Sequence, residues 1–324
     1  MTTPRAAFAC AAWFMIAAAA AHAQSYPTKP IRLIIGFPPG GSNDIVARQI
    51  APKLTQLLGA QVIVENRPGA NATIATDFVA KAAPDGYTLM LGSASPLVIS
   101  PFTYPNIPYD TLRDLAPITT VGSTPEMIAI HPSLPARNLK ELIVLAKAQP
   151  GKLNFASSGN GGLPHLAIEL FGNLAKVKIV HVPYKGAGPA AVDLMGGHVH
   201  AMIIDMPALA PGVKSGKLRG IAVTAEKRSP LLPDLATTAE QGMPALIAVN
   251  WFGIMAPART PKAIVDKLHE AIVKAATAPD MKQQFDTIGV EAFVQTTPEA
   301  FTTFLRNELA RWGKVAKESG AKAD

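Results

Sequence analysis

Short runs of β-branched and aliphatic residues alternate along the chain with stretches that carry apolar residues at helical spacing. The runs predict buried strands at residues 31–37, 62–66, 88–92, 127–131, 153–156, 179–182, 201–205 and 220–224. Between the first two runs, Val46, Ile50 and Leu54 fall on one face of a helix that we expect over residues 42–58. This alternation is typical of an α/β fold with largely parallel sheets.

The longer connections suggest that the chain crosses twice between two parts of the molecule. Two proline-rich stretches, residues 96–110 and 131–138, predict surface connections. Residues 121–125 and 248–252 are candidate crossings, and Pro261 is placed to begin a long helix after the second. A chain of 324 residues is long enough for two domains. We therefore expect a first lobe that is interrupted by a second.

The N-terminal residues have the layout of a secretory signal peptide. Arg5 precedes an apolar run over residues 6–20, and a triplet of small residues follows at 21–23. A membrane anchor would need about 20 apolar residues, which is more than this run provides. We expect cleavage between Ala23 and Gln24 and export to the periplasm.

Composition narrows the range of functions further. The only cysteine, Cys10, lies inside the signal segment, so a mature chain would have no thiol chemistry and would suit an oxidising compartment. The formal net charge of +7 is spread along the chain and not gathered into a basic block. With few aromatic residues beside it, this charge does not predict a nucleic-acid interface. No second stretch is long and apolar enough to predict a membrane span.

Two glycine-rich loops, each placed between a predicted strand and a predicted helix, are the most informative local features. The first is FPPGGSN, residues 37–43, in which Ser42 or Asn43 can cap a helix; the second is SSGNGGLP, residues 157–164, in which Pro164 opens a helix. Glycines allow close approach of a ligand, and the first helical turn offers unpaired N–H groups and a partial positive charge. The alternative is two ordinary βα turns, but a pair of such loops in different lobes predicts a shared anion site.

Motifs for other chemistry are absent or weak. Neither loop matches GxxxxGK[ST] or GxGxxG, so a carboxylate is favoured over a phosphate, and no GxSxG or HExxH motif predicts catalysis. His198, His200 and Asp205 could be imagined as a metal site, although alternate positions along a strand explain them equally well. We expect no metal and no cofactor. His165, in the first turn after the second loop, is either a packing residue or a ligand contact.

The chain resembles one family along almost its whole mature length: the periplasmic binding proteins of the tripartite tricarboxylate transporters, also known as the Bordetella uptake gene family. The resemblance implies a two-lobe, Venus-flytrap α/β fold of the type II-like periplasmic-binding-protein kind, with a first lobe over residues 24–123 and 249–324 and a second over 124–248. The matching segments, in the family's order, are YPTKPIRLIIGFPPGGSNDIVARQIAPKL, VENRPGANATIA, APDGYTLMLGSAS, NFASSGNGGLPHLAIELF, VHVPYKGAGPA, GKLRGIAVTAEKRSPLLPDLATTAEQGMP and WFGIMAPARTP.

The resemblance also implies a small organic acid as ligand, held by loop amides, hydroxyls and ordered waters. The ligand-binding residues that it implies in the two lobes are Gly40, Gly41, Ser42, Asp44, Ser93, Ser95, Ser158, Gly159, Gly161, His165, Tyr184, Lys185 and Asp205. Gly162 stands where many relatives have serine or threonine, so this chain lacks one side-chain hydrogen bond of the family pattern.

The predicted function is therefore a monomeric receptor, not an enzyme, that delivers a carboxylate to the membrane permease subunits of a tripartite tricarboxylate transporter. One alternative is an exported hydrolase that uses Asp44, His165 or Asp205 in the same cleft, although no set of nucleophile, base and oxyanion donors can be identified. Another is a ligand-sensing module for a signalling partner. The ligand could be a citrate-like acid, a dicarboxylate, an aromatic carboxylate, an amino acid or a nicotinic-type compound.

Overall fold

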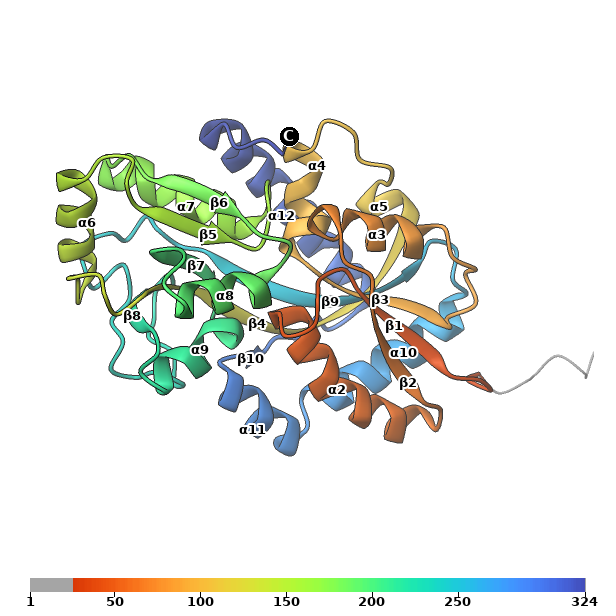
Figure 1. Cartoon of the computed structure of the whole chain (residues 1–324). Coiled ribbons are helices and arrows are strands. Elements are labelled where there is room, and N and C mark those ends of the chain that lie inside the picture. Colours follow the sequence, from red (N-terminus) through yellow and green to blue (C-terminus); the bar gives the residue numbers. More distant parts are fainter. Residues whose placement is uncertain (1–25, 324) are drawn as a thin grey trace, which may run out of the picture.

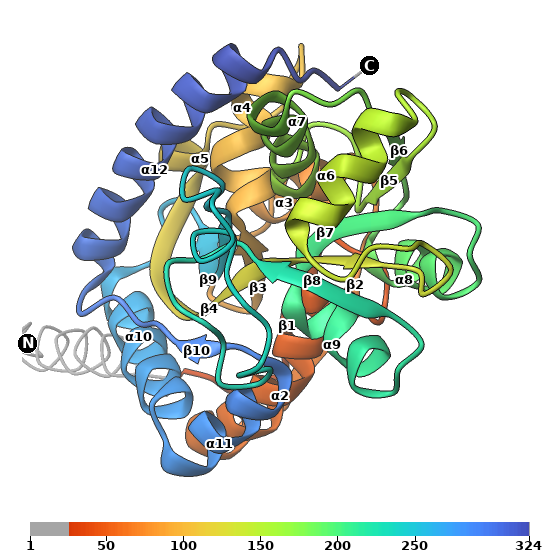
Figure 2. The same cartoon turned by 90° about the vertical axis from the view of Figure 1, so that its left-hand side faces the viewer.

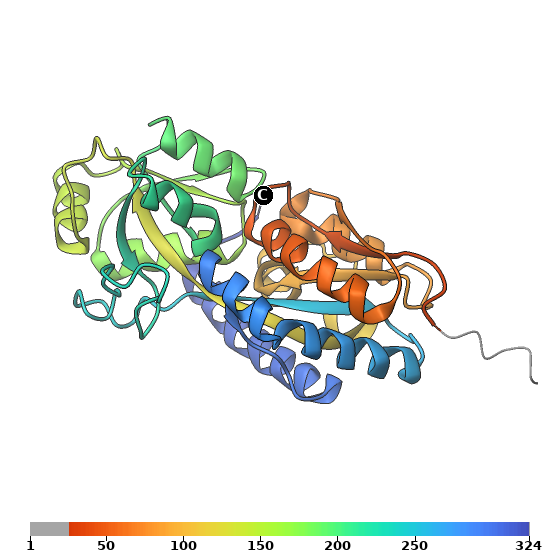
Figure 3. The ribbon, with the colours of Figure 1, turned by 90° about the horizontal axis from the view of Figure 1, so that it is seen from below.

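The computed structural model describes residues 26–323. The signal peptide, its cleavage site and Cys10 lie outside the described residues. Two lobes lie side by side and are joined by two long strands that pass between them (Figures 1 and 3). Each lobe is a sheet covered by helices, which confirms the predicted α/β class.

The strands follow the order β2-β1-β3-β9-β4-β7-β5-β6, with β8 and β10 paired to β4. Most lie within two residues of their predicted positions, and the predictions for β2 and β7 are confirmed to the residue. Their bounds are β1 Ile31–Ile35, β2 Val62–Asn66, β3 Thr88–Ser93, β4 Leu115–Ile130, β5 Asn154–Ser157, β6 Val180–Pro183, β7 Ala201–Asp205, β8 Arg219–Val223, β9 Val249–Pro257 and β10 Glu291–Ala292.

The two crossing strands are β4 and β9, and they make the sheets mixed. From Leu115 to Pro125, β4 pairs with β9, whereas from Glu126 onward it pairs with β7 and β8. The chain leaves the first lobe along β4 and returns along β9, so these strands run antiparallel. The sheets are parallel only away from the crossing, in the pairs of β1 with β2 and β3 and of β5 with β6 and β7. The prediction of largely parallel sheets was therefore wrong at the crossing strands.

The term first lobe is used here for β1–β3, β10 and the helices on them, and the term second lobe for β5–β8 and theirs. Residues 42–58 form a helix with the predicted bounds, and Pro261 directly precedes another. Among residues 26–323, no helix combines the length and the hydropathy needed to cross a bilayer. The helices are α2 Ser42–Leu58, η2 Ala70–Ala72, α3 Thr73–Ala80, η3 Ser95–Ile99, α4 Ser100–Thr103, α5 Thr111–Asp114, α6 Leu139–Ala148, α7 Leu163–Ala175, α8 Ala187–Met195, α9 Met206–Lys214, α10 Lys262–Ala276, α11 Pro279–Ile288 and α12 Pro298–Ser319.

Strand β1 shows why the apolar runs are continuous. Ile31, Leu33 and Ile35 pack on one face of the sheet with apolar residues of α2 and α10. Ile34 faces the other side and packs with Val79 of α3. Because both faces of the sheet are covered, alternation of apolar and polar residues is lost. The first lobe thus holds the carboxyl end of β1, and the loop that follows it, on a rigid base.

The first proline-rich stretch is not a surface connection along its whole length. It begins with the helical segments η3 and α4, and Pro96, Leu97 and Val98 are buried. Proline is tolerated in the first turn of a helical segment, where no N–H partner is needed, and the apolar residues that follow pack near α12. Figure 2 shows α12 lying along these segments. The second stretch, residues 131–138, connects β4 to α6 as predicted.

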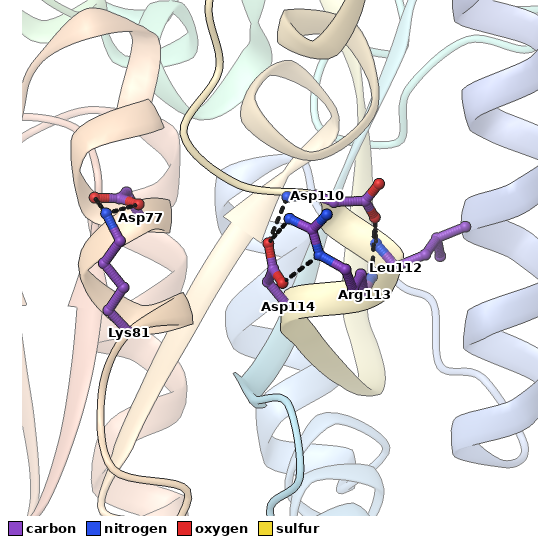
Figure 4. A network of polar contacts seen from close by, with 6 residues as sticks. All are labelled: Asp77, Lys81, Asp110, Leu112, Arg113 and Asp114. Atoms are coloured by element: carbon purple, nitrogen blue, oxygen red, sulfur yellow. Dashed lines mark hydrogen bonds and ion pairs between the residues drawn. The ribbon is translucent and has the colours of Figure 1, made fainter.

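The first proline-rich stretch ends at Asp110, where reciprocal hydrogen bonds cap the start of α5 (Figure 4). Asp110 Oδ1 accepts hydrogen bonds from the backbone N–H groups of Leu112 and Arg113, at 2.9 Å each, and Asp114 Oδ2 accepts from the N–H of Asp110 at 2.8 Å. Arg113 also donates to Asp114, and this hydrogen bond is the main cause that lowers the pKa of Asp114 to about 2. The cap fixes where the chain turns into the crossing strand β4.

Candidate functional site

Four helices begin around one small pocket between the lobes. Ser42 is the first residue of α2, Pro164 lies in the first turn of α7, Ala187 begins α8 and Asp205 precedes α9. Helix starts present unpaired N–H groups and a partial positive charge, so their convergence suits an anion. This inner pocket, of about 20 Å³, is lined by Phe37, Gly41, Ser42, Asn43, Ser158, Pro164, Ala187, Ile204 and Asp205.

The start of α2 differs from its prediction in a way that matters for binding. The capping residue is Gly41, with extended backbone and no side-chain cap, and not Ser42 or Asn43. The Ser42 hydroxyl is therefore not used to cap the helix. It is buried, it lines the inner pocket and it makes no hydrogen bond of good geometry, although it lies close enough to the Asp205 carboxyl group to lower the pKa of that group. Since a buried hydroxyl without a partner is costly, a ligand oxygen in the pocket would stabilise it.

A larger cavity of about 610 Å³ adjoins the inner pocket, and Phe37 and Ser158 line both. The inner pocket has room for a group about the size of one water molecule, whereas the outer cavity falls in the range of small-molecule sites. This outer cavity is lined by Gly36, Phe37, Pro38, Pro68, Gly69, Ala70, Asn71, Ala72, Tyr104, Ser158, Gly159, Asn160, Pro183, Tyr184, Lys185 and Ala323.

The structure brings together seven of the residues that the sequence singled out. Those that line the inner pocket are Gly41, Ser42, Ser158 and Asp205, and those that line the outer cavity are Ser158, Gly159, Tyr184 and Lys185. The others lie outside both cavities, namely Gly40, Asp44, Ser93, Ser95, Gly161 and His165. Most of these six shape the two glycine loops or join the lobes.

Asp44 holds the first glycine loop. Its carboxylate accepts hydrogen bonds from the Gly40 N–H at 3.1 Å and from the side chains of Arg48 and Asn66 at 2.9 Å. Burial raises the pKa of Asp44, but these hydrogen bonds outweigh burial and keep that pKa below its usual range. Asp44 therefore stays ionised and is directed toward its own loop.

Ser95 and its neighbours join the lobes. Ser95 Oγ accepts a hydrogen bond from the N–H of Leu163, the first residue of α7, at 3.0 Å. Thr103 Oγ1 donates to the Gly161 carbonyl at 2.8 Å, and the Tyr104 hydroxyl donates to the Asn160 carbonyl at 3.2 Å. The segment after β3 thus contacts the second glycine loop directly. Ser93 is buried at the end of β3, opposite Phe252 of β9.

His165 and His181 pack against each other and hydrogen-bond to residues of the second glycine loop. Their rings stack with centroids 3.8 Å apart and an interplanar angle of 11°. Gly161 N–H donates to His165 Nδ1 at 3.0 Å, and His181 Nε2 lies 2.6 Å from Ser157 Oγ, which also accepts from the Gly159 N–H. His165 is therefore a packing residue that orients a loop amide. His181 has the same role and was missed, because nothing in its local sequence distinguishes it from any other strand histidine.

Glycines let the lobes approach closely. A Cβ atom at Gly162 would lie 2.9 Å from the side-chain amide of Asn71 and 3.0 Å from Ser95 Oγ. At Gly186, with φ of +133°, a Cβ would lie 2.6 Å from Pro38 Cδ. A side chain at Gly162 would force the side chains of Asn71 and Ser95 to shift, so the glycine allows Asn71 to lie against the second lobe.

Asn71 is the main residue that the sequence reasoning missed. Ala70, Asn71 and Ala72 all have positive φ, between 44° and 69°, a conformation that costs about 1–2 kcal/mol for each non-glycine residue. Asn71 Nδ2 donates to Ser100 Oγ at 3.1 Å, while its Oδ1 is buried without a partner. The sequence does contain a signal for this loop, because residues 62–73 form a third example of a strand followed by a glycine turn and the start of a helix. Strain of this kind concentrates at binding sites.

A pair of buried carboxyl groups lies behind the inner pocket. Asp205 accepts a hydrogen bond from Asn250 Nδ2 at 3.0 Å and lies beside the Ser42 hydroxyl. Both contacts lower the pKa of Asp205, but burial outweighs them and raises that pKa to about 6. Glu126 stands directly opposite Asp205 in the pairing of β4 with β7, is fully buried, and has no partner for either carboxyl oxygen. Burial, and then the charge of Asp205, raise the pKa of Glu126 well above its usual range.

Glu126→Met is expected to raise the free energy of unfolding at pH 7.5 by about 1–3 kcal/mol, because an unsatisfied buried polar group of similar size is removed. A carboxyl group with a raised pKa in the folded protein contributes a cost that grows as the pH rises above its unfolded value of about 4. The gain should therefore be larger at pH 7.5 than at pH 4.5. Urea unfolding at both pH values checks this, and a variant less stable than wild type at pH 7.5 would show that Glu126 is satisfied.

Among residues 26–323, no three His, Cys, Asp or Glu side chains are gathered as metal ligands would be. His200 Nδ1 accepts a hydrogen bond from the Asn154 N–H at 2.9 Å, so this ring ties β5 to the turn before β7. Asp205 faces the inner pocket instead. His200 and Asp205 thus have separate structural surroundings.

Comparisons with a family model, with related sequences and with solved structures all indicate the same family. Residues 46–321 match the model of the tripartite tricarboxylate transporter family receptor. The chain is 42% identical to the protein BugT of Bordetella pertussis over 306 residues, which is 94% of each chain. Among solved structures, the periplasmic binding protein BugD has a TM-score of 0.87 at 34% identity, with 92% of this chain and 100% of that chain covered.

Two further solved structures carry organic acids. One is an R. palustris protein with adipate, with a TM-score of 0.89 at 34% identity over 92% of this chain and 100% of that one. The other is MatC from Rhodopseudomonas palustris with bound malate, with a TM-score of 0.85 at 29% identity over 90% of this chain and 99% of that one. Fold, site geometry and sequence agree: the chain belongs to the tripartite tricarboxylate transporter family of receptors, as a Bug protein with the two-lobe fold of periplasmic binding proteins.

Proposed function

We propose that the protein is a periplasmic receptor that clamps a small organic acid between its lobes and delivers it to a tripartite tricarboxylate transporter. The observation that carries the proposal is the convergence of four helix starts, one from the first lobe and three from the second, on the inner pocket. Relatives of similar fold with adipate and malate support the same class of ligand.

In the proposed complex, one carboxylate of the guest directs an oxygen into the inner pocket, which has room for a group of that size. The Ser42 hydroxyl, the hydroxyl of Ser158 and backbone N–H groups at the starts of α2 and α7 would donate to its oxygens, since burying a carboxylate is costly unless each oxygen finds donors. The remainder of the guest extends into the outer cavity, where Lys185 and Tyr104 can meet a distal polar group. A dicarboxylate would fit this arrangement, with one carboxylate at the inner pocket and the other in the outer cavity.

Closure is the proposed mechanism. The guest binds one lobe first, and the other hinges over it because only the closed form completes the contacts. We place the lobes at residues 24–123 with 249–324 and at 124–248, joined where β4 changes sheets. Cleavage of the signal peptide between Ala23 and Gln24 and action as a monomer belong to the same proposal.

Binding without turnover is also part of the proposal. The structure does pair a serine with a histidine, Ser157 with His181, but Ser157 is fully buried and lines neither cavity. A substrate placed in the inner pocket would meet Ser42, Ser158 and the carboxyl group of Asp205, but no histidine lines either cavity to form a serine–histidine pair with them. The site is built to hold an anion.

A thermal-shift screen of organic acids, followed by calorimetry, tests this function. Adipate, malate, succinate and citrate should be compared with adipate dimethyl ester, which keeps the chain and removes the charge. A bound acid at about 100 times its dissociation constant should add about 2.7 kcal/mol to stability, and the ester should add nothing. Equal stabilisation by the ester, or conversion of the bound acid during long incubation, would contradict an anion receptor.

A further inference from the structure

The inner pocket lacks the positively charged side chains that an anion site often has. None of its lining residues is Lys, Arg or His, and its one ionisable side chain is the carboxyl group of Asp205. The donors are hydroxyls and helix starts, which carry only partial positive charge. A carboxylate guest would thus be placed beside a second carboxyl group, that of Asp205, which is buried between the lobes.

The surroundings of Asp205 offer no compensating cation. Strand β4 contributes Glu126, fully buried and directly opposite, and β9 contributes the uncharged Asn250. Helix α2 contributes Asp44, which is bonded to Gly40, Arg48 and Asn66 and does not line the pocket. The other residues at the pocket, on α7 and α8 and on β7, are uncharged. The charge of Asp205 adds to burial in raising the pKa of Glu126.

Like charges held close together in a low-dielectric site raise one another's pKa, and a protonated carboxyl group becomes a hydrogen-bond donor. We propose that the receptor takes up a proton from solvent when it binds its organic acid, that Asp205 holds this proton against the guest carboxylate, and that Glu126 stays neutral behind it. In this way Asp205 donates a hydrogen bond to the guest carboxylate instead of repelling it. The inference rests on the proposed function, because it needs an anionic guest in the inner pocket.

The neighbouring groups fit this assignment. Asp205 Oδ2 accepts a hydrogen bond from Asn250, and the Ser42 hydroxyl lies beside the same carboxyl group at the pocket. A proton on Asp205 would leave the Ser42 hydroxyl to donate to the guest. Burial already raises the pKa of Asp205 to about 6 in the absence of any guest. A further negative charge in contact with it would raise that pKa in the same direction, which is the direction of proton uptake.

Isothermal titration calorimetry with adipate and with malate, at pH 7.5 in phosphate and in Tris, measures the proton directly. These buffers differ in ionisation enthalpy, so the difference in observed heat gives the protons taken up per guest. We expect about one proton for the wild-type receptor, and an affinity that falls about tenfold per pH unit between pH 6.5 and 8.5. Both acids are fully ionised in this range, so they do not supply the proton.

Asp205→Asn should bind in a manner independent of pH and of buffer, because the amide keeps a donor and cannot titrate. Glu240→Gln, which alters a surface carboxylate of the second lobe paired with Arg228, is the matched control and should retain the uptake. Wild-type binding with the same heat in both buffers would overturn the inference while leaving the receptor function intact, as would unchanged uptake in Asp205→Asn. Failure of both acids, succinate and citrate to bind at all would instead overturn the proposed function.

Discussion

Replacing Gly162 by valine is expected to weaken binding of an organic acid about a hundredfold, which corresponds to roughly 2.7 kcal/mol. The backbone at Gly162 is extended, with φ of −100°, so valine fits the isolated second lobe. In the structure its Cβ would meet Asn71 and Ser95 at 2.9–3.0 Å, and its methyl groups would come closer still. These contacts belong to the closed form that we propose. The cost therefore falls on closure and not on folding. Calorimetry measures the affinity, and thermal unfolding without ligand should change by less than about 2 °C.

Gly172→Ala is the control for this variant. Gly172 lies in the same helix, α7, but a Cβ there would make only an ordinary contact, 3.5 Å from the Val177 carbonyl, far from the first lobe. Its affinity should equal that of wild type. If Gly162→Val also bound normally, the lobes could not meet at Asn71 when the ligand is bound, and the proposed closed form would be wrong.

His165→Leu is expected to weaken binding by about tenfold to a hundredfold, since the buried Gly161 N–H would lose its acceptor at a cost of about 1–3 kcal/mol. The loop that supplies Ser158 and Gly159 would then relax away from the cavities. His165→Asn should restore most of the affinity, because its Oδ1 can stand where Nδ1 accepts the hydrogen bond.

The comparison of leucine with asparagine separates positioning from packing. Leucine fills the space of the imidazole but cannot accept a hydrogen bond, whereas asparagine fills less space and can accept one. Calorimetry at pH 7.5 on both variants decides between the roles. Equal losses would mean that His165 acts only by filling space beside His181.

The fold could be predicted from sequence wherever structure is local. Apolar runs located the strands, and the glycine loops after residues 37 and 157 correctly predicted where α2 and α7 begin. The crossing strands were predicted only in part, because β4 gains its full length from pairing with β9, which is 130 residues or so further along the chain. The buried proline segment at Ser95–Ile99 was mistaken for a surface loop, since its burial depends on distant α12.

The site, like the fold, could be predicted where it depends on local sequence and not where it depends on distant contacts. Two loops that could form an anion site were visible, and the structure places Ser42 and Ser158 at one pocket. The starts of α8 and α9 could not be assigned to that pocket, because only tertiary packing brings them there. The partnership of Glu126 with Asp205 was equally hidden, since it depends on the register of β4 against β7. Residues that act through loop geometry, such as Asp44, resemble direct ligand contacts in sequence.

A third cavity allows a direct test of where the guest binds. Between α7 and α12 lies an apolar pocket of about 300 Å³, bordered by Leu166, Trp312 and Val315, which is large enough for a small guest. A crystal structure of the receptor with adipate distinguishes the two places. The account predicts one carboxylate in the inner pocket, within hydrogen-bond distance of Ser42 Oγ and of backbone N–H groups that begin α2 and α7. Adipate bound beside Trp312, with the inner pocket occupied only by solvent, would contradict it.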